Sequence, residues 1–209
     1  MKRLKNNLVI LLPLFALLSA CRSTPVRMAN LNEGNWRAKA LIKDLEQSRS
    51  YIVNLNINAV RDERARMDVV SALGTGVASL LADAKEVRYV LLDSKRYYFG
   101  NPSPEVMKPI LAIPFDPRWL HNIMFEVALP EKTWTCSKDA EGWMKDCKDS
   151  ATGLKITWSA RQGEKKTILI EHHKATVQIN VQSFKPKVED RKNLFQLEAP
   201  AGYQKLRVR

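Results

Sequence analysis

Residues 52–59 read IVNLNINA, and apolar and polar side chains alternate without a break from Val53 to Ala59. Val53, Leu55 and Ile57 point to one side of an extended chain, whereas the asparagines between them point to the other. Such alternation is typical of an antiparallel strand that buries one face and exposes the other to water. We therefore expect a sheet with one apolar face and one wet face.

The two-residue period recurs along most of the chain. In residues 65–69, Ala65, Met67 and Val69 alternate with charged residues. Further strands are expected at 77–82, 86–91, 96–99, 155–160, 166–171, 176–184 and 194–198. Short polar turns between them predict an antiparallel meander of about nine to eleven strands, strongly curved into a half-barrel.

Three helices are expected beside the strands. Apolar residues at helical spacing in residues 36–49 predict an N-terminal helix. Ser103-Pro104 and Asp116-Pro117 each join a capping residue to a proline that suits the first helical position. These two short helices carry apolar faces and are expected to cover the concave face of the sheet as a lid. The predicted fold class is therefore α+β.

The concave face and its lid enclose either an apolar ligand or a core packed with side chains, and the sequence leaves both possibilities open. The expected lining residues come from the strands and from the second lid helix. They are Val53, Leu55, Ile57, Met67, Val69, Trp119, Leu120, Ile123, Val177, Ile179 and Val181.

The beginning of the chain resembles a bacterial lipoprotein signal. Three basic residues in the first five positions precede an apolar run that ends at Leu18-Ser19-Ala20-Cys21. This run is too short to span a bilayer. We expect removal of residues 1–20 and lipidation of Cys21, whereas an ordinary signal peptide followed by a chance cysteine is the alternative.

The segment after the lipidation site predicts where the protein resides. Residues 21–35 are expected to be a lipidated, flexible tether, and residues 36–209 a single domain. The sorting signal that holds lipoproteins at the inner membrane is an aspartate after the cysteine, and this position holds Arg22. We therefore expect a lipid-anchored protein at the outer membrane, facing the periplasm.

The remaining cysteines fit an exported protein, and the chain stays positively charged after the signal is removed. Loss of three basic residues with the signal lowers the formal charge from +12 to about +9. Nucleic acid is not an expected partner, because the basic residues are scattered and the chain leaves the cytoplasm. Anionic headgroups, an acidic partner or plain solubility remain open. Cys136 and Cys147 predict a disulfide across a hairpin in an oxidising compartment.

Catalytic and metal-binding patterns are missing from the sequence. Gly74-Thr75-Gly76 lacks the third glycine of a dinucleotide fingerprint and falls between strands. The chain contains neither a Gly-x-Ser-x-Gly elbow nor histidines and cysteines at zinc-ligand spacing. We expect a protein that is not an enzyme and holds no cofactor or metal.

Two short motifs are SALGTG at residues 71–76, and LAIPFD at residues 111–116 with Trp119-Leu120 after it. Both motifs resemble the LolB family of outer-membrane lipoprotein receptors. The resemblance covers about residues 52–158 and implies the half-barrel fold that LolB shares with its periplasmic carrier LolA. It also implies that Leu73 inserts cargo into the membrane. Residues 195–203 resemble the C-terminal strand of the carrier.

Together these features predict a monomer that accepts acylated lipoproteins from a LolA-like periplasmic carrier. It would shelter their acyl chains in an apolar cavity and insert them into the outer membrane. A protein of the same shape that binds lipid or glycolipid in the envelope, without sorting lipoproteins, is the alternative. A structural lipoprotein with a filled core is a third possibility.

Overall fold

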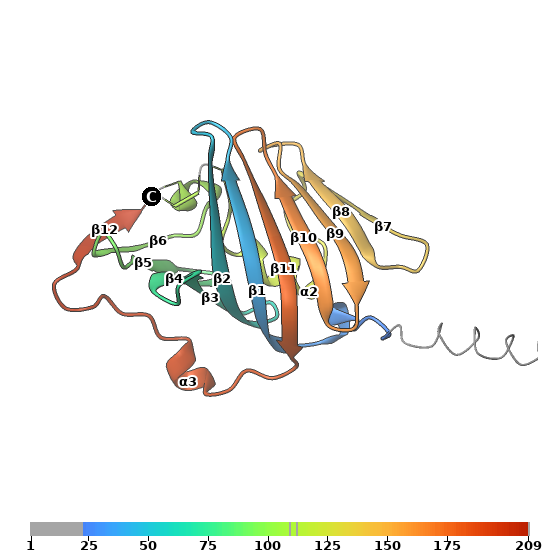
Figure 1. The fold of residues 1–209 in the computed structure, drawn as a ribbon, viewed down its shortest axis with the longest axis horizontal. Coiled ribbons are helices and arrows are strands. Elements are labelled where there is room, and N and C mark those ends of the chain that lie inside the picture. The colour runs from blue at the N-terminus through green and yellow to red at the C-terminus, as the bar shows by residue number, and fades with distance from the viewer. Residues whose placement is uncertain (1–22, 109, 112, 209) are drawn as a thin grey trace, which may run out of the picture.

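The computed structural model describes residues 23–108, 110–111 and 113–208. The predicted signal peptide and Cys21 lie outside these residues. Figure 1 shows that the described chain is built on one large, curved sheet. Its twelve strands follow the order β12-β6-β5-β4-β3-β2-β1-β11-β10-β9-β8-β7, so the edge strands β12 and β7 do not pair with each other and the sheet is open.

The elements have the following bounds. The first six strands are β1 (Glu33–Asp44), β2 (Arg49–Val60), β3 (Arg64–Ser71), β4 (Gly76–Asp83), β5 (Val87–Leu91) and β6 (Arg96–Gly100). The others are β7 (Trp134–Lys138), β8 (Met144–Asp149), β9 (Lys155–Gln162), β10 (Lys165–Glu171), β11 (Ala175–Lys185) and β12 (Gln204–Val208). The helical turns are η2 (Met28–Asn30), η3 (Pro104–Met107), α2 (Trp119–Phe125) and α3 (Arg191–Leu194).

Strand β1 joins two antiparallel meanders into one sheet, because it pairs with β2 on one side and with β11 on the other. The meanders run from β1 to β6 and from β7 to β11. The last strand, β12, is added parallel to β6 at one edge. The predicted curved, mainly antiparallel sheet is thus confirmed, with twelve strands in place of the nine to eleven expected.

The predicted helix at residues 36–49 is wrong, because residues 33–44 form β1. Trp36 and Ala40 are four residues apart, a spacing that fits one face of a helix and also one face of a strand. Ala38 lies between them and is buried on the same side, which only the strand period allows. Pairing along both edges of β1 favours the strand over any local helical preference.

The predicted strand at residues 194–198 is also wrong. This stretch follows α3 as a segment without strand pairing, and β12 begins only at Gln204. Phe195 and Leu197 are buried because they pack with Val188 against Tyr97 on the outer face of the sheet. The C-terminal segment therefore covers the outer face over β4–β6. The prediction that this whole face is exposed to water is wrong there.

The main core fills the concave face. Side chains from β1–β6 and from β7–β11 meet those of η3, α2 and the connections between them in a single cluster. The residues of this main cluster, and those of the smaller cluster on the outer face, lie at or after Met28 in the chain. Within the described part of the chain, no helix is both long and apolar enough to cross a membrane.

The segment expected to be a flexible tether differs from that prediction where it is described. Residues 23–32 run along the end of the sheet, and their helical turn η2 buries Met28 in the main core. Arg61 donates hydrogen bonds to the Ala29 carbonyl at 2.6 Å and to the Asn32 side chain at 2.9 Å. Because β1 begins at Glu33, the domain also starts before the expected residue 36.

Candidate functional site

The predicted lining residues all lie on the concave side of the sheet or on the lid. Nine of the eleven belong to the buried core cluster, and the other two, Met67 and Val69, are partly buried against it. Pairing explains how the strands bring them together: Leu55 faces Val69 and Ile57 faces Met67 across β2 and β3. The structure therefore gathers these side chains into one apolar surface.

Helix α2 covers this surface. Asp116 accepts a hydrogen bond from the Arg118 backbone amide at 2.9 Å and pairs with the Arg118 guanidinium, which fixes the turn that starts the helix. Phe125, at the other end of α2, packs edge-on against Trp36 of β1 with ring centroids 5.1 Å apart. Both aromatic side chains are fully buried. In this conformation the concave face is filled, so an acyl chain can bind there only if the lid moves.

Four side chains, which we call the latch, hold the C-terminal end of α2 to the sheet. Trp158 donates a hydrogen bond to the Ile123 carbonyl at 3.0 Å. Lys166 donates to the Met124 carbonyl at 2.7 Å and pairs with Glu126 at 2.9 Å. Arg161 pairs with the other oxygen of Glu126 at 2.8 Å, which completes the latch.

The latch satisfies groups that a helix leaves without partners. The last carbonyls of an α-helix lack their regular i+4 donor. Here Lys166 donates to the Met124 carbonyl, and Trp158 donates to the Ile123 carbonyl, which also accepts the Glu126 backbone amide at 3.3 Å. Glu126 ends the helix in the left-handed conformation. Burial lowers the pKa of Lys166 to about 8, although the attraction of Glu126 acts in the opposite direction. The lid is thus held by a buried charge cluster as well as by apolar contact.

Leu73 lies on the hairpin turn between β3 and β4 and is 95 % exposed. The Ser71 hydroxyl accepts hydrogen bonds from the backbone amides of Leu73 at 3.3 Å and Thr75 at 3.1 Å. Gly74 adopts a φ of +87°, which glycine accommodates without strain. The turn is therefore locally fixed and presents an apolar side chain to solvent.

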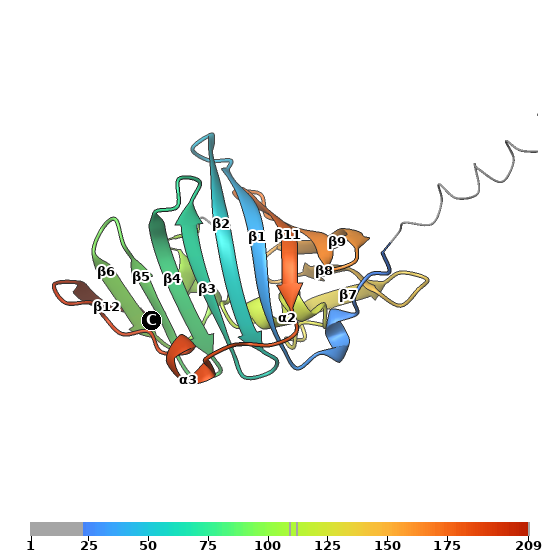
Figure 2. The same cartoon turned by 60° about the horizontal axis from the view of Figure 1, so that its bottom comes forward.

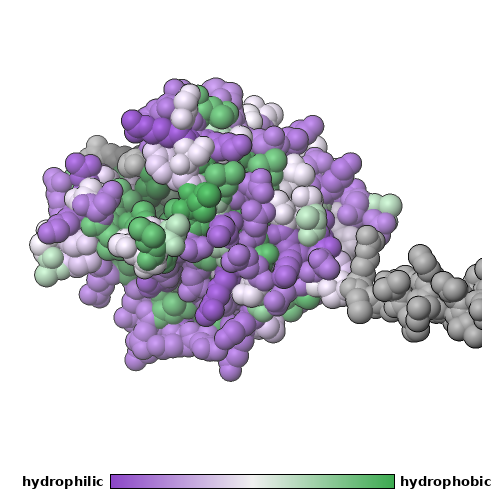
Figure 3. All heavy atoms as spheres, in the orientation of Figure 1, coloured by the Kyte–Doolittle hydropathy of each residue, from purple (hydrophilic) through white to green (hydrophobic). Residues whose placement is uncertain are grey.

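Two neighbouring hairpin turns at the same end of the sheet also carry an exposed leucine (Figure 2). Leu45 lies between β1 and β2 and is 50 % exposed, and Leu92 follows β5 and is 36 % exposed. We call these three turns the tips. Figure 3 shows hydrophobic surface gathered in the part of the molecule where Figure 1 places β4–β6. The sequence singled out Leu73, but not its two companions.

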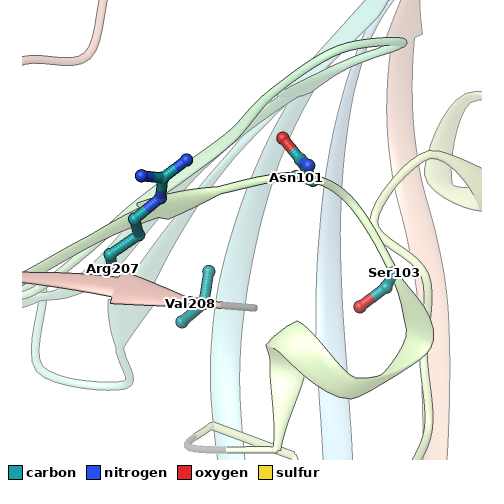
Figure 4. A pocket seen from close by; sticks show the side chains of 4 residues that line it. All are labelled: Asn101, Ser103, Arg207 and Val208. Carbon is teal, nitrogen blue, oxygen red and sulfur yellow. The ribbon is translucent and has the colours of Figure 1, made fainter.

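A pocket of about 390 Å³ lies away from the predicted lining residues. Asn101, Ser103, Arg207 and Val208 line it where β6 meets β12 and η3 (Figure 4). The sequence contains no signal for it, because β12 was not expected at that edge. Among the described residues, no three His, Cys, Asp or Glu side chains gather as a metal site would require.

The predicted cysteine pair forms a disulfide between β7 and β8, where Cys136 and Cys147 face each other across the hairpin. This staple lies at the edge of the sheet, next to the strands that carry the latch. The latch itself leaves no recognisable pattern in the sequence. In the sequence alone, its three charged residues look like ordinary surface charges: Glu126, Arg161 and Lys166. Only the fold brings them together under the lid.

No protein-family model matches this chain, and no curated protein is similar to it at a significant level. Among solved structures, it is similar to an uncharacterized conserved protein from Thermus thermophilus, with 13 % identity and a TM-score of 0.42 over 87 % of this chain and 94 % of the other. A LolA superfamily protein from Nitrosomonas europaea gives 7 % identity and a TM-score of 0.49 over 79 % and 90 %.

A third similar structure, from Vibrio parahaemolyticus, is named as an outer membrane lipoprotein-sorting protein domain. It gives 9 % identity and a TM-score of 0.47 over 78 % of this chain and 89 % of the other. At such identities and TM-scores, these similarities carry no inference about function. The functional proposal depends on the residues of this chain and on the geometry of their sites.

Proposed function

We propose that this protein is a lipoprotein, anchored through Cys21 in the outer membrane, that receives acylated lipoproteins and inserts them into that membrane. A LolA-like periplasmic carrier delivers the cargo, and the protein acts as a monomer without catalysis, cofactor or metal. The observation that carries the proposal is the pairing of an apolar concave face under a latched lid with a fixed, exposed leucine at a tip.

The concave face provides shelter for acyl chains. Each methylene removed from water contributes about 0.8 kcal/mol, so an acyl chain crossing the periplasm needs an apolar surface along its whole length. Leu55, Val69 and Ile179 belong to such a surface. In the closed state the lid covers it, which keeps it from water while no cargo is bound. Cargo enters when α2 lifts and its apolar face becomes part of the binding site.

Leu73 provides the contact with the destination membrane. Its side chain makes no contribution to the core, so its exposure is available for a bilayer. A leucine at the centre of a bilayer is favoured over a charged residue by about 3 kcal/mol, a factor of roughly 150 in partitioning, and this is the upper limit for a tip that enters less deeply. A charge at this position therefore acts on the membrane step alone.

The test uses Leu73→Glu with Thr75→Glu as its matched control. Thr75 is exposed in the same turn, and its backbone rather than its side chain maintains the turn geometry. Purified protein loaded with an acylated lipoprotein is mixed with outer-membrane vesicles, and the cargo that reaches the vesicles is measured. We expect Leu73→Glu to retain cargo and lose delivery by up to roughly 150-fold, while Thr75→Glu delivers normally. Normal delivery by Leu73→Glu contradicts the proposal.

A lipid- or glycolipid-binding role has the same structural requirements, and the bound material separates the two. Isolation of an exported form with Cys21→Ser, which carries no anchor and needs no detergent, followed by mass spectrometry, identifies its ligands and partners. Acylated proteins together with a periplasmic carrier support lipoprotein sorting. Free lipid in the absence of acylated proteins supports the alternative.

A further inference from the structure

The N-terminal segment of residues 23–31 is docked on the turn between β9 and β10. The Val26 backbone amide donates a hydrogen bond to the Gly163 carbonyl at 2.9 Å, and the Gly163 amide donates one to the Ser23 carbonyl at 3.2 Å. A β-carbon placed on Gly163 would lie 3.5 Å from that of Ser23. The first described residue is therefore held directly against this turn.

Side chains reinforce the docking. The Arg27 guanidinium stacks over the Trp143 ring at 4.2 Å, and it donates a hydrogen bond to the Glu141 carbonyl at 2.7 Å. Met28 is buried beneath α2. The crevice between this segment and the latch leaves no room for a water molecule. The segment thus closes one end of the domain.

The docked segment and the tips lie at opposite ends of the sheet. The β9–β10 turn adjoins the end where β1 begins, whereas the three tips project at the end where β1 finishes, as Figures 1 and 2 show. Along the strand register, Leu73 lies about seven residues and four strand spacings from Gly163, a separation of about 30 Å. Cys21 is only two residues before Ser23, so it reaches about 7 Å from the docking site.

While the segment stays docked, the lipid site and the tips are held about 30 Å apart at opposite ends of the sheet. When the strands stand upright on the membrane, a lipid at Cys21 draws the β9–β10 end towards the bilayer and turns the tips away from it. When residues 22–32 are free and extended, they span at most about 40 Å, enough for the tips to reach the membrane that holds Cys21. If only residues 22–27 are released, they span about 20 Å, which is too short for the tips to reach that membrane.

We infer that residues 23–31 form a releasable strap, and that the protein presents its tips to its own anchoring membrane only after the strap leaves the β9–β10 turn. This inference rests on the proposed function, because it requires lipidation of Cys21 and a membrane role for Leu73. With the strap docked, the tips face away from the membrane; with the strap released, the domain turns and Leu73 reaches the bilayer.

The test locks the strap with a disulfide. Ser23→Cys and Gly163→Cys place two β-carbons 3.5 Å apart, within the range that a disulfide bridges. Gly163 has a φ of +57°, so the Gly163→Cys single variant also measures the effect of strain in this turn. Leu73 is replaced by the photo-crosslinking residue p-benzoylphenylalanine, and the lipidated protein is reconstituted at about one molecule per phosphatidylethanolamine–phosphatidylglycerol vesicle. The yield of crosslinked lipid reports whether the tip touches the bilayer. The single cysteine variants are matched controls.

We expect the locked, lipidated protein to crosslink at least tenfold less lipid than either single variant. The Trp143→Ala variant should crosslink more lipid than the protein with an unaltered strap. A Cys21→Ser form without residues 1–20 carries no anchor and is free to turn, so its locked and unlocked versions should crosslink equally to added vesicles. Equal yields from locked and unlocked lipidated protein overturn the strap. No crosslinking in any form removes the membrane role of Leu73, and the strap with it.

Discussion

The charge cluster of the latch allows a sharp test of how the lid is held. Glu126→Gln keeps the shape of the side chain and removes the only negative charge that the latch contains. Glu126 is 4 % exposed, and the two cations that it neutralises, Lys166 and Arg161, are 2 % and 13 % exposed. Their charges would then face each other without a counterion and with little access to water.

The expected loss of stability follows from that burial. Removing one partner from a buried ion pair costs about 3–5 kcal/mol, because the remaining charge stays desolvated. Lys166→Met is the matched comparison, since it leaves Glu126 paired with Arg161 and removes a desolvated charge. Its loss should be about 1 kcal/mol, mainly from the hydrogen bond to the Met124 carbonyl.

Urea unfolding followed by tryptophan fluorescence measures both losses, and the double variant gives the coupling between the two residues. We expect Glu126→Gln to be the more damaging change by at least about 2 kcal/mol, and the double variant to recover part of its loss. A Glu126→Gln protein that is as stable as Lys166→Met, or more stable, would refute the assignment of the latch as a buried charge cluster.

Three further predictions concern stability. The folded pKa of Lys166 is about 8 and its ordinary value is 10.5, so between these values the unfolded chain holds a proton that the folded chain has lost. The free energy of unfolding should therefore rise with pH across this window, by at most about 1.4 kcal/mol per pH unit, and urea titrations of Lys166→Met should lack this component. Replacing Cys136 and Cys147 together by alanine should lower the free energy of unfolding by about 3 kcal/mol, because the loop of ten residues is no longer closed in the unfolded chain; a loss below about 1 kcal/mol would contradict this. Gly34→Ala should cost about 1–3 kcal/mol in thermal or urea unfolding, since its β-carbon would lie 2.5 Å from the Phe184 ring and 2.7 Å from the Trp36 ring.

The sequence predicted most strands because their burial is one-sided. In β2, β10 and β11, apolar and polar residues alternate where the concave side is covered by the lid and the other side carries polar side chains. The same property grouped Val53, Leu55 and Ile57 correctly on one face. Leu73 was singled out for a different reason, since the resemblance to the LolB family implies an exposed leucine at this turn; the side chain is exposed, and its membrane role stays a prediction.

The errors arose where tertiary contacts decide the structure. Trp36 and Ala40 fit two periods, and only pairing with β2 and β11 selects the strand. Phe195 and Leu197 alternate like strand residues but bury themselves by crossing the outside of the sheet. The docking of Arg27 on Trp143, and the meeting of Glu126 with Lys166, join residues far apart in the chain and leave no local signal.

The central claim is that acyl chains of cargo lie on the concave face, and two adjacent valines on β3 test it most directly. Val69 packs against the concave core, whereas Val70 points to the outer face, and both side chains are partly buried. p-Benzoylphenylalanine is placed at each position in cells, and the crosslinked adducts are identified by mass spectrometry. We predict that position 69 captures the acyl chains of lipoproteins and that position 70 does not. Equal capture at both positions, or no acylated adduct at position 69, would contradict the claim.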